Sequence, residues 1–459
     1  MKKTILLISA LLTILPVFAS EKEAKKEDSP VKEHLQNHFK LYGFIRNYFV
    51  FDTRESVSGT GNLFYYLPKD LNLNDAGQDL NAQPSFRFLA LTSRVGLDVN
   101  GYYINNLHFG AKVEADFYSG LSGSTGTATM RLRQAYATIT WKDLPLSDEK
   151  KASVGLKIGQ AWHPMAADFP HVFSLEVGAP FGPFSRTPQV TMDASLGGNW
   201  AITASALWQM QYTSMGPSWN STKKIYEAAA SADYMKYSCV PEMYAGVTYK
   251  NEVFLFRAGV DMLSITPRIQ NMKEGADGKY TAYKVNERLT TVSPFAYVQY
   301  AKGLFSVRAK TIYGQGGEHF NLMSGYVKVG DENSDGSWNY ASLRNSSSWL
   351  SLSYGKKWQG VLFLGYVKNL GLAQAAENPL KKADVYFCGN GFSNINQLYR
   401  INPQLIYNIG KMNIGLEYQW TAVQYGDYDN GCLNNRGLAT KNLHWVGNNR
   451  INMMVKYNF

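Results

Sequence analysis

Apolar and polar residues alternate with a period of two along most of the chain, and the pattern is clear in the last eleven residues. In 449–459, apolar side chains occupy every second position from Ile451 to Phe459, opposite Arg450, Asn452 and Lys456. A strand that meets lipid on one side and water on the other alternates in this way. The segment is therefore predicted to be the closing strand of an outer-membrane β-barrel, in which closure leaves no backbone group unpaired in hydrocarbon.

Alternating stretches of about ten residues, the length that crosses a bilayer at barrel tilt, recur from residue 39 onward, and we count roughly sixteen. In 107–118 the residues Leu107, Val113 and Phe117 share an apolar face, whereas Lys112 and Glu114 share an ionic one. The other predicted strands are 89–99, 254–262, 305–313, 399–409 and 412–422, with weaker candidates starting near Phe39, Met130, Val154, Pro188, Trp200, Met243, Leu289, Ser347 and Val361.

Short and long connections alternate strictly between these stretches. Short turns are expected near Gly101, 143–151, Gly197, Lys250, Lys302, 355–358 and Gly410. Long loops are expected at 52–85, 119–129, 162–187, 213–241, 264–288, 315–345, 369–396 and 425–447. Both termini then lie on the short-turn side. The predicted fold is all-β, a transmembrane antiparallel barrel with short periplasmic turns and long extracellular loops.

The start of the chain has the composition of an export signal. Lys2 and Lys3 precede an apolar stretch, and small residues near Ala19 suit cleavage. We expect 1–20 to be a signal peptide, 21–38 a short charged periplasmic segment and 39–459 the barrel. Beyond the signal, no apolar run approaches the roughly 18 residues of a membrane helix.

Composition narrows the function further. The formal charge of +10 becomes +8 without Lys2 and Lys3, and no basic tract suggests nucleic-acid binding. A mean hydropathy of −0.27 argues against a helical membrane bundle, while a polar lumen explains it. Aromatic residues at the predicted short-turn ends indicate an interfacial belt, which a soluble β-sandwich would have to expose to water. They are Tyr102, Tyr103, Trp200, Trp358, Tyr457 and Phe459.

The third long loop is the predicted constriction. Segment 163–186 combines four prolines with six large apolar side chains, which a wholly exposed loop would not need. We expect it to fold against the inner wall and to place Asp168, Glu176 or Arg186 at the narrowest point. The alternative is that its aromatic residues cover the barrel mouth or a subunit boundary without narrowing the pore.

The polar strand faces predict a basic pore wall. Arg131 and Arg133 are the main candidates opposite the loop, and rings of one charge in a confined pore select ions of the other sign. Further cations that face inward by parity are Lys112, Arg94, Arg257, Arg308, Lys310 and Arg400. The carboxylates Glu114, Asp116, Asp98, Asp261 and Glu417 offset part of this charge, so a mild anion preference is expected.

Strand 130–141 departs from the lipid-facing pattern. By simple parity, the face opposite Arg131 and Arg133 carries Gln134, Tyr136 and Thr138. A protein partner covering this face would explain it and would favour an oligomer. A β-bulge, which shifts parity by one residue, is the alternative.

A metal-like motif occurs in the sixth long loop. Asp331, Asn333, Asp335 and Gly336 match the first half of a calcium-binding loop, but Ser342 stands where a bidentate Glu is required. Calcium is one interpretation, and a plain acidic turn is the other.

The three cysteines show no metal or redox spacing. Cys388 and Cys432 lie in the last two long loops, which are neighbours in a closed barrel, so a disulfide between them is one expectation and separate thiols are the other. The four loop histidines have no triad motif beside them, so we expect no enzyme; they are His163, His171, His319 and His444. An outer-membrane hydrolase whose triad is assembled from distant segments is the alternative.

Two neighbouring strands resemble a known family. Segment 130–136, MRLRQAY, and segment 156–162, LKIGQAW, precede the proline-rich loop. This combination resembles the Gram-negative porin superfamily, particularly its DcaP-like branch. The resemblance implies a sixteen-stranded trimeric diffusion porin, with 163–186 as constriction loop facing Arg131 and Arg133. Segment 21–38 is too short for the coiled-coil extension found in parts of that branch.

The sequence therefore predicts an outer-membrane porin for passive diffusion of small hydrophilic solutes, preferably anions, with outer-membrane lipid as its surroundings and a homotrimer as its assembly. A substrate-specific outer-membrane channel is the nearest alternative. A barrel-anchored surface binding protein or adhesin, using loops such as 213–241 and 425–447, is the alternative from another class.

Overall fold

The computed structural model describes residues 38–59, 64–90, 93–117, 121–122, 127–147, 150–174, 177–388 and 392–459. The predicted signal peptide, nearly all of the predicted charged segment, and Glu176 lie outside these ranges. Within them, no helix is both long enough and apolar enough to span a membrane.

Sixteen antiparallel strands form the closed barrel wall within the described ranges, as the sequence pattern predicts. The second wall strand consists of two pieces, β4 and β5, which both pair with β1. The barrel closes where β29 pairs with β1, from Phe44 opposite Asn458 to Asp52 opposite Arg450. The wall is β1 (Phe39–Asp52), β4 (Ser85–Leu89) with β5 (Arg94–Ile104), β6 (Leu107–Asp116), β9 (Arg131–Pro145), β10 (Lys151–Trp162), β11 (Arg186–Ser195), β12 (Trp200–Leu207), β15 (Glu242–Lys250), β16 (Phe254–Ile265), β19 (Leu289–Lys302), β20 (Phe305–Gln315), β22 (Asn339–Gly355), β23 (Trp358–Gly371), β26 (Ile395–Ile409), β27 (Met412–Asp427) and β29 (Lys441–Asn458).

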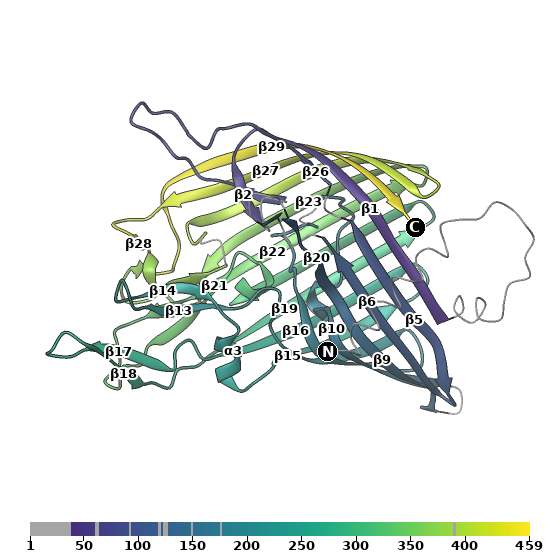
Figure 1. The fold of residues 1–459 in the computed structure, drawn as a ribbon, viewed down its shortest axis with the longest axis horizontal. Helices are drawn as coiled ribbons and strands as arrows, with labels where there is room; N and C mark the ends of the chain where they lie inside the picture. Colours follow the sequence, from purple (N-terminus) through teal and green to yellow (C-terminus); the bar gives the residue numbers. More distant parts are fainter. Residues whose placement is uncertain are drawn as a thin grey trace, which may run out of the picture.

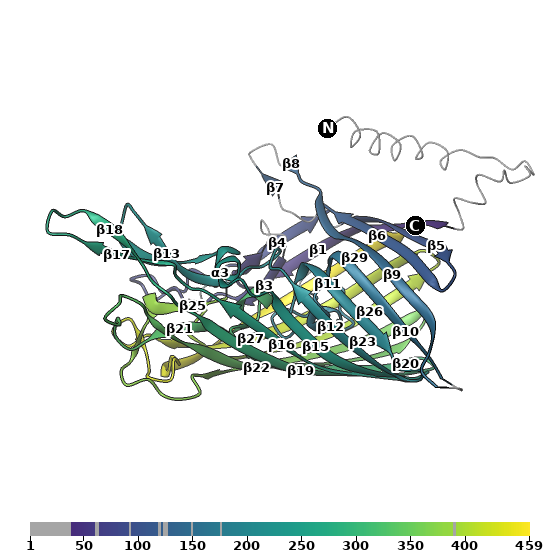
Figure 2. The same cartoon turned by 90° about the horizontal axis from the view of Figure 1, so that it is seen from below.

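The remaining elements belong to the long connections. Most of them lie at one end of the barrel, while the short turns and the C-terminus lie at the other end (Figure 1, Figure 2). They are β2 (Ser56–Gly59), β3 (Phe64–Pro68), β7 (Leu121–Ser122), β8 (Thr127–Ala128), η2 (Pro164–Ala166), β13 (Met215–Asn220), β14 (Ile225–Ala230), α3 (Asp233–Ser238), β17 (Gln270–Glu274), β18 (Tyr280–Lys284), η3 (Gly317–Phe320), β21 (Gly325–Val329), β24 (Leu380–Lys381), η4 (Lys382–Asp384), β25 (Val385–Phe387) and β28 (Cys432–Leu433).

The two faces of the wall have opposite character, because side chains alternate along each strand. On β6, Val113 is 52% exposed on the outside, whereas Glu114 is 4% exposed on the inside. The predicted interfacial aromatics also stand on the outer surface: Tyr102, Tyr103, Trp200, Trp358, Tyr457 and Phe459 are all exposed. The barrel therefore has the apolar exterior and aromatic rim of a membrane-spanning barrel.

A bulge corrects the interpretation of strand 130–141. Glu114 pairs with Gln134, but the next residue, Ala115, pairs with Leu132, which leaves Arg133 as an extra residue. Parity changes there, so Gln134 and Tyr136 share the inner face with Glu114 and Lys112, their partners on β6. The polar row faces the lumen, and this strand gives no support for an oligomer.

The largest buried apolar cluster lies inside the barrel. It joins Met165 and Phe181 of the third long loop to Trp349 and Phe363 on the inner wall. Phe320 from the sixth long loop belongs to the same cluster. Apolar packing therefore fixes loops in the lumen.

The predicted disulfide is absent from the structure. No disulfide joins Cys388 to Cys432, and both residues carry thiols. Cys388 is buried beside β25 in the apolar cluster, whereas the Cys432 thiol lies near the Asn430 carbonyl at the loop surface. The two loops do meet, because β24 pairs with β28, but Cys432 lies opposite Lys381 there and not opposite Cys388.

Candidate pore constriction

The third long loop runs along the inner wall of the barrel. Near its start, Asp168 pairs with Arg257 of β16. Two cations of β20 then bind its backbone: Lys310 Nζ donates to Met165 O at 2.6 Å, and Arg308 donates to Phe169 O at 3.2 Å. Arg257, Arg308 and Lys310 thus hold the loop against the inner wall.

The second half of the loop is bound to other strands of the inner wall. Arg400 of β26 donates to Ala179 O at 3.0 Å, and Ser347 of β22 donates to Phe181 O at 2.9 Å. The Tyr48 hydroxyl of β1 donates to the Phe173 carbonyl. Because these partners extend from β22 to β1, the loop crosses a wide arc of the lumen.

His171 adds a neutral polar contact to this arc. Its Nδ1 lies 3.0 Å from the Ser353 hydroxyl on β22. Burial lowers the pKa of His171 to about 4, with Arg308 contributing in the same direction. The imidazole is therefore neutral near pH 7 and adds no charge to the pore.

Glycines in the wall make room for the loop's aromatic rings. A Cβ at Gly365 of β23 would lie 2.4 Å from the Phe181 ring, and one at Gly415 of β27 would lie 2.8 Å from the Phe173 ring. Both contacts are shorter than packed atoms allow. The two rings therefore pack directly against the backbone of these wall glycines.

We expect Gly365→Val to displace Phe181 and to lower the free energy of unfolding by about 1–3 kcal/mol, the usual cost of overpacking. Urea unfolding of the folded barrel, followed by Trp fluorescence, measures this loss. Gly360→Val is the matched control, because Gly360 lies on the same strand with nothing near its Cβ position. Equal effects of the two substitutions would contradict the packing of Phe181 against Gly365.

A second loop segment also enters the lumen, which sequence reasoning missed. Residues from η3 to Met323 are buried, and Phe320 O accepts a hydrogen bond from Phe184 N of the third loop at 2.9 Å. The signal was present, because Phe320, Leu322 and Met323 are apolar residues within a long polar loop.

The predicted basic wall residues form an ionic ladder with carboxylates. Arg133 binds both Glu114 and Asp116 at 2.6 Å, and Arg131 binds Asp116 at 3.1 Å. Arg94 lies 3.6 Å from Glu114. The structure therefore brings these predicted residues together on β5, β6 and β9, with part of the positive charge offset.

Lys112 and Asp98, two further charged residues that were predicted to face the lumen, pair at 2.7 Å. Arg186, which begins β11, is 1% exposed and lies over the Trp162 ring at 4.8 Å. Its Nε donates to Gln211 at 2.9 Å. Arg186 is thus packed into the root of the loop.

Three cations surround a single aromatic ring on the wall beside this ladder. Arg46, Arg94 and Lys456 lie 4.8, 5.0 and 5.6 Å from the centroid of Phe44. Arg46 and Lys456 face each other across the closing seam of the barrel. We name this group, Arg46, Arg94 and Lys456, the cationic cluster. Only Arg94 was among the predicted pore residues, because the other two lie on strands at opposite ends of the chain.

The predicted calcium motif forms a turn closed by its own side chains. Asp335 accepts hydrogen bonds from the backbone and hydroxyl of Ser337 at 2.9 and 2.6 Å. Asn333 Oδ1 accepts one from Asn339 at 3.2 Å, while Asp331 is exposed. These bonds occupy oxygens that a calcium ion would use, and calcium binding stays a prediction.

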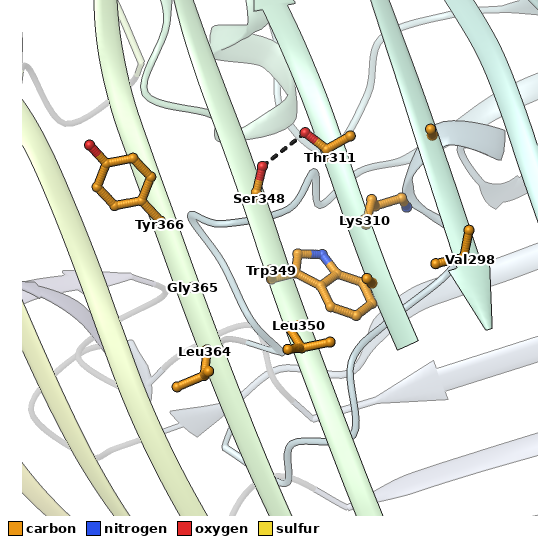
Figure 3. A pocket seen from close by; sticks show the side chains of 11 residues that line it. Val298, Lys310, Thr311, Ser348, Trp349, Leu350, Leu364, Gly365 and Tyr366 are labelled. Atoms are coloured by element: carbon orange, nitrogen blue, oxygen red, sulfur yellow. Dashed lines mark hydrogen bonds between the residues drawn. The ribbon is translucent and has the colours of Figure 1, made fainter. Parts of the chain in front are cut away.

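A hollow of about 420 Å³ lies in the wall across β19, β20, β22 and β23 (Figure 3). Thr311 and Ser348 in it share a hydrogen bond of 2.8 Å, which satisfies both hydroxyls. Lys310 and Ser347 point into the lumen, where they bind the third loop. Thr311 and Ser348 are the next residues on the same strands, so their side chains face outward. The hollow therefore belongs to the membrane-facing surface rather than to the pore.

Comparison with solved structures identifies the architecture. No protein-family model matches the chain, and a search among curated proteins finds no significant match. The crystal structure of the outer membrane channel DcaP of Acinetobacter baumannii is similar, with a TM-score of 0.60, 16% identity, and coverage of 92% of this chain and 97% of that chain. OmpT, an outer membrane protein of Vibrio cholerae, gives a TM-score of 0.50 at 11% identity, covering 95% of this chain and 100% of that one. The chain has the fold of the Gram-negative outer-membrane porins, as its sequence pattern predicted.

Proposed function

We propose that this outer-membrane channel lets small hydrophilic solutes diffuse passively, with a preference for anions. The observation that carries the proposal is a closed barrel whose third loop is fastened across the lumen. Sixteen strands enclose more space than their own side chains fill, so such a loop sets the width of the path. The proposal includes no catalysis or energy coupling.

The anion preference rests on the charges of the wall. The ladder on β5, β6 and β9 has three guanidinium groups against Glu114 and Asp116. Arg46 and Lys456 add two positive charges around Phe44. In a confined lumen, where charges are screened less than on a surface, this excess attracts anions and repels cations.

Solute-induced swelling of liposomes that contain the purified barrel tests the proposal. Small organic anions should enter faster than organic cations of equal size, and large sugars should be excluded. Liposomes that contain heat-denatured barrel serve as the control. Equal exclusion of all small solutes would contradict an open diffusion path.

We further propose that the barrel assembles as a homotrimer through the outer face of β1 and β4. Phe49 and Phe88 stack there at 4.5 Å, and Phe86 is 66% exposed. Exposed aromatic side chains of this kind are enriched where protein surfaces meet. Light scattering in detergent should give the mass of three chains, and the mass of one chain for Phe86→Ser with Phe88→Ser. A single-chain mass for the unmodified protein would refute the assembly.

A further inference from the structure

A group of buried ionisable side chains lies where the third long loop leaves the wall. His163 begins the loop, Glu242 begins β15, and Asp261 lies on β16. None of them is more than 2% exposed. His163 Nε2 lies 3.2 Å from Glu242 Oε1 and 3.4 Å from Asp261 Oδ1. A loop residue thus meets two wall carboxylates away from solvent.

The hydrogen bonds of this group are incomplete. His163 Nε2, Glu242 Oε2 and Asp261 Oδ1 are all buried without a hydrogen-bond partner. The ion pairs that the described residues make with these two carboxylates involve histidines. Burying carboxylates without full compensation is strongly unfavourable, so the arrangement calls for additional positive charge.

The hydrogen-bond geometry indicates that His163 does not supply this charge. His163 Nδ1 accepts a hydrogen bond from Met165 N at 3.1 Å, which is incompatible with a doubly protonated ring. His319 approaches the same oxygen of Glu242, with its Nε2 at 2.9 Å from Oε1, and its Nδ1 lies 3.2 Å from Gly316 O. One imidazolium at His319, which pairs with Glu242, then has to balance two carboxylates.

The spacing of the ligand atoms matches a metal centre. Ligand atoms bound tetrahedrally to zinc at its usual bond lengths lie about 3.3 Å from one another. The two separations from His163 are close to this value, and suitable atoms of His163, Glu242 and Asp261 all lie within 4.8 Å of one another. A ring nitrogen with two carboxylate oxygens is a donor set that divalent transition metals accept.

We propose that His163, Glu242 and Asp261 bind a divalent transition-metal ion of the zinc type, with His319 orienting Glu242. The metal takes the place of the proton on His163 Nε2, and this proton moves to Nδ1. Nδ1 then no longer accepts the hydrogen bond from Met165 N. Because the ligands come from the loop, β15 and β16, the ion fixes the root of the constriction loop to the wall. The site does not depend on whether the pore conducts.

Metal analysis of the full chain, extracted from membranes without chelators and dialysed, tests the site. We expect about one zinc-type ion per folded chain, because the three ligands form one site. After removal of this ion, added Co²⁺ should give the visible absorption of cobalt bound to nitrogen and oxygen. Both signals should be lost in His163→Asn and in Asp261→Asn.

His171→Asn is the matched control, because His171 lies in the same loop but contacts Ser353 on another part of the wall. It should keep both the metal and the cobalt spectrum. Heat-modifiable gel mobility shows whether each variant has folded. A folded unmodified chain that retains no metal and gives no cobalt absorption would overturn the proposal, whatever the variants do.

Discussion

Replacing residues 165–183 by a short glycine–serine linker should raise the single-channel conductance at least about twofold, because the segment that narrows the lumen is removed. The flanking backbone makes this change feasible. His163 N donates to Ser185 O at 3.1 Å, so the two ends of the segment are already adjacent. Currents in planar bilayers, recorded with and without the segment, measure the effect.

The matched control shortens a hairpin that lies outside the lumen. Replacing 271–283, which includes most of β17 and β18, by the same linker should leave the conductance unchanged, because this hairpin extends beyond the barrel end (Figure 1). If the barrel without 165–183 is folded and conducts like the unmodified protein, the third loop does not set the width of the path.

Neutralising the cationic cluster with Arg46→Gln, Arg94→Gln and Lys456→Gln should abolish the anion preference. The three charges surround one ring, and their loss leaves Glu114 and Asp116 facing Arg131 and Arg133 alone. We expect the anion-to-cation permeability ratio to fall several-fold. The reversal potential across a salt gradient measures this ratio.

The control for this triple variant removes the same total charge from the extracellular hairpins. Lys223, Lys273 and Lys279 are exposed lysines on β13–β14 and β17–β18. Salt screens such charges within about 10 Å, so changing them to Gln should leave the reversal potential unchanged. A similar shift in both triple variants would show that selectivity follows net charge rather than the cationic cluster.

The barrel was predictable because each wall strand obeys a local rule. Lipid on one side and water on the other impose the period of two, and the length of a strand follows from the thickness of the membrane. Closure between β1 and β29 could be inferred from the alternation of 449–459 alone. The same rule assigned Arg257, Arg308 and Lys310 to the inner face but could not show that they bind the loop backbone.

The rest depends on contacts that no local pattern encodes. One extra residue at Arg133 reverses parity on β9. The polar row on strand 130–141 signalled a departure from simple alternation, but the sequence could not decide between a bulge and a protein partner that covers this face. The buried group at His163 draws on three further segments, through Glu242, Asp261 and His319. Its members are far apart in sequence, so neither motif spacing nor periodicity predicts the group.

Single-channel recording from the unmodified, folded protein in a planar bilayer tests the central claim, an open and anion-preferring pore, most directly. The proposed function predicts stable current steps whose reversal potential in a salt gradient has the sign of anion flow. Absence of current from barrels whose folding is verified by heat-modifiable mobility would contradict the claim.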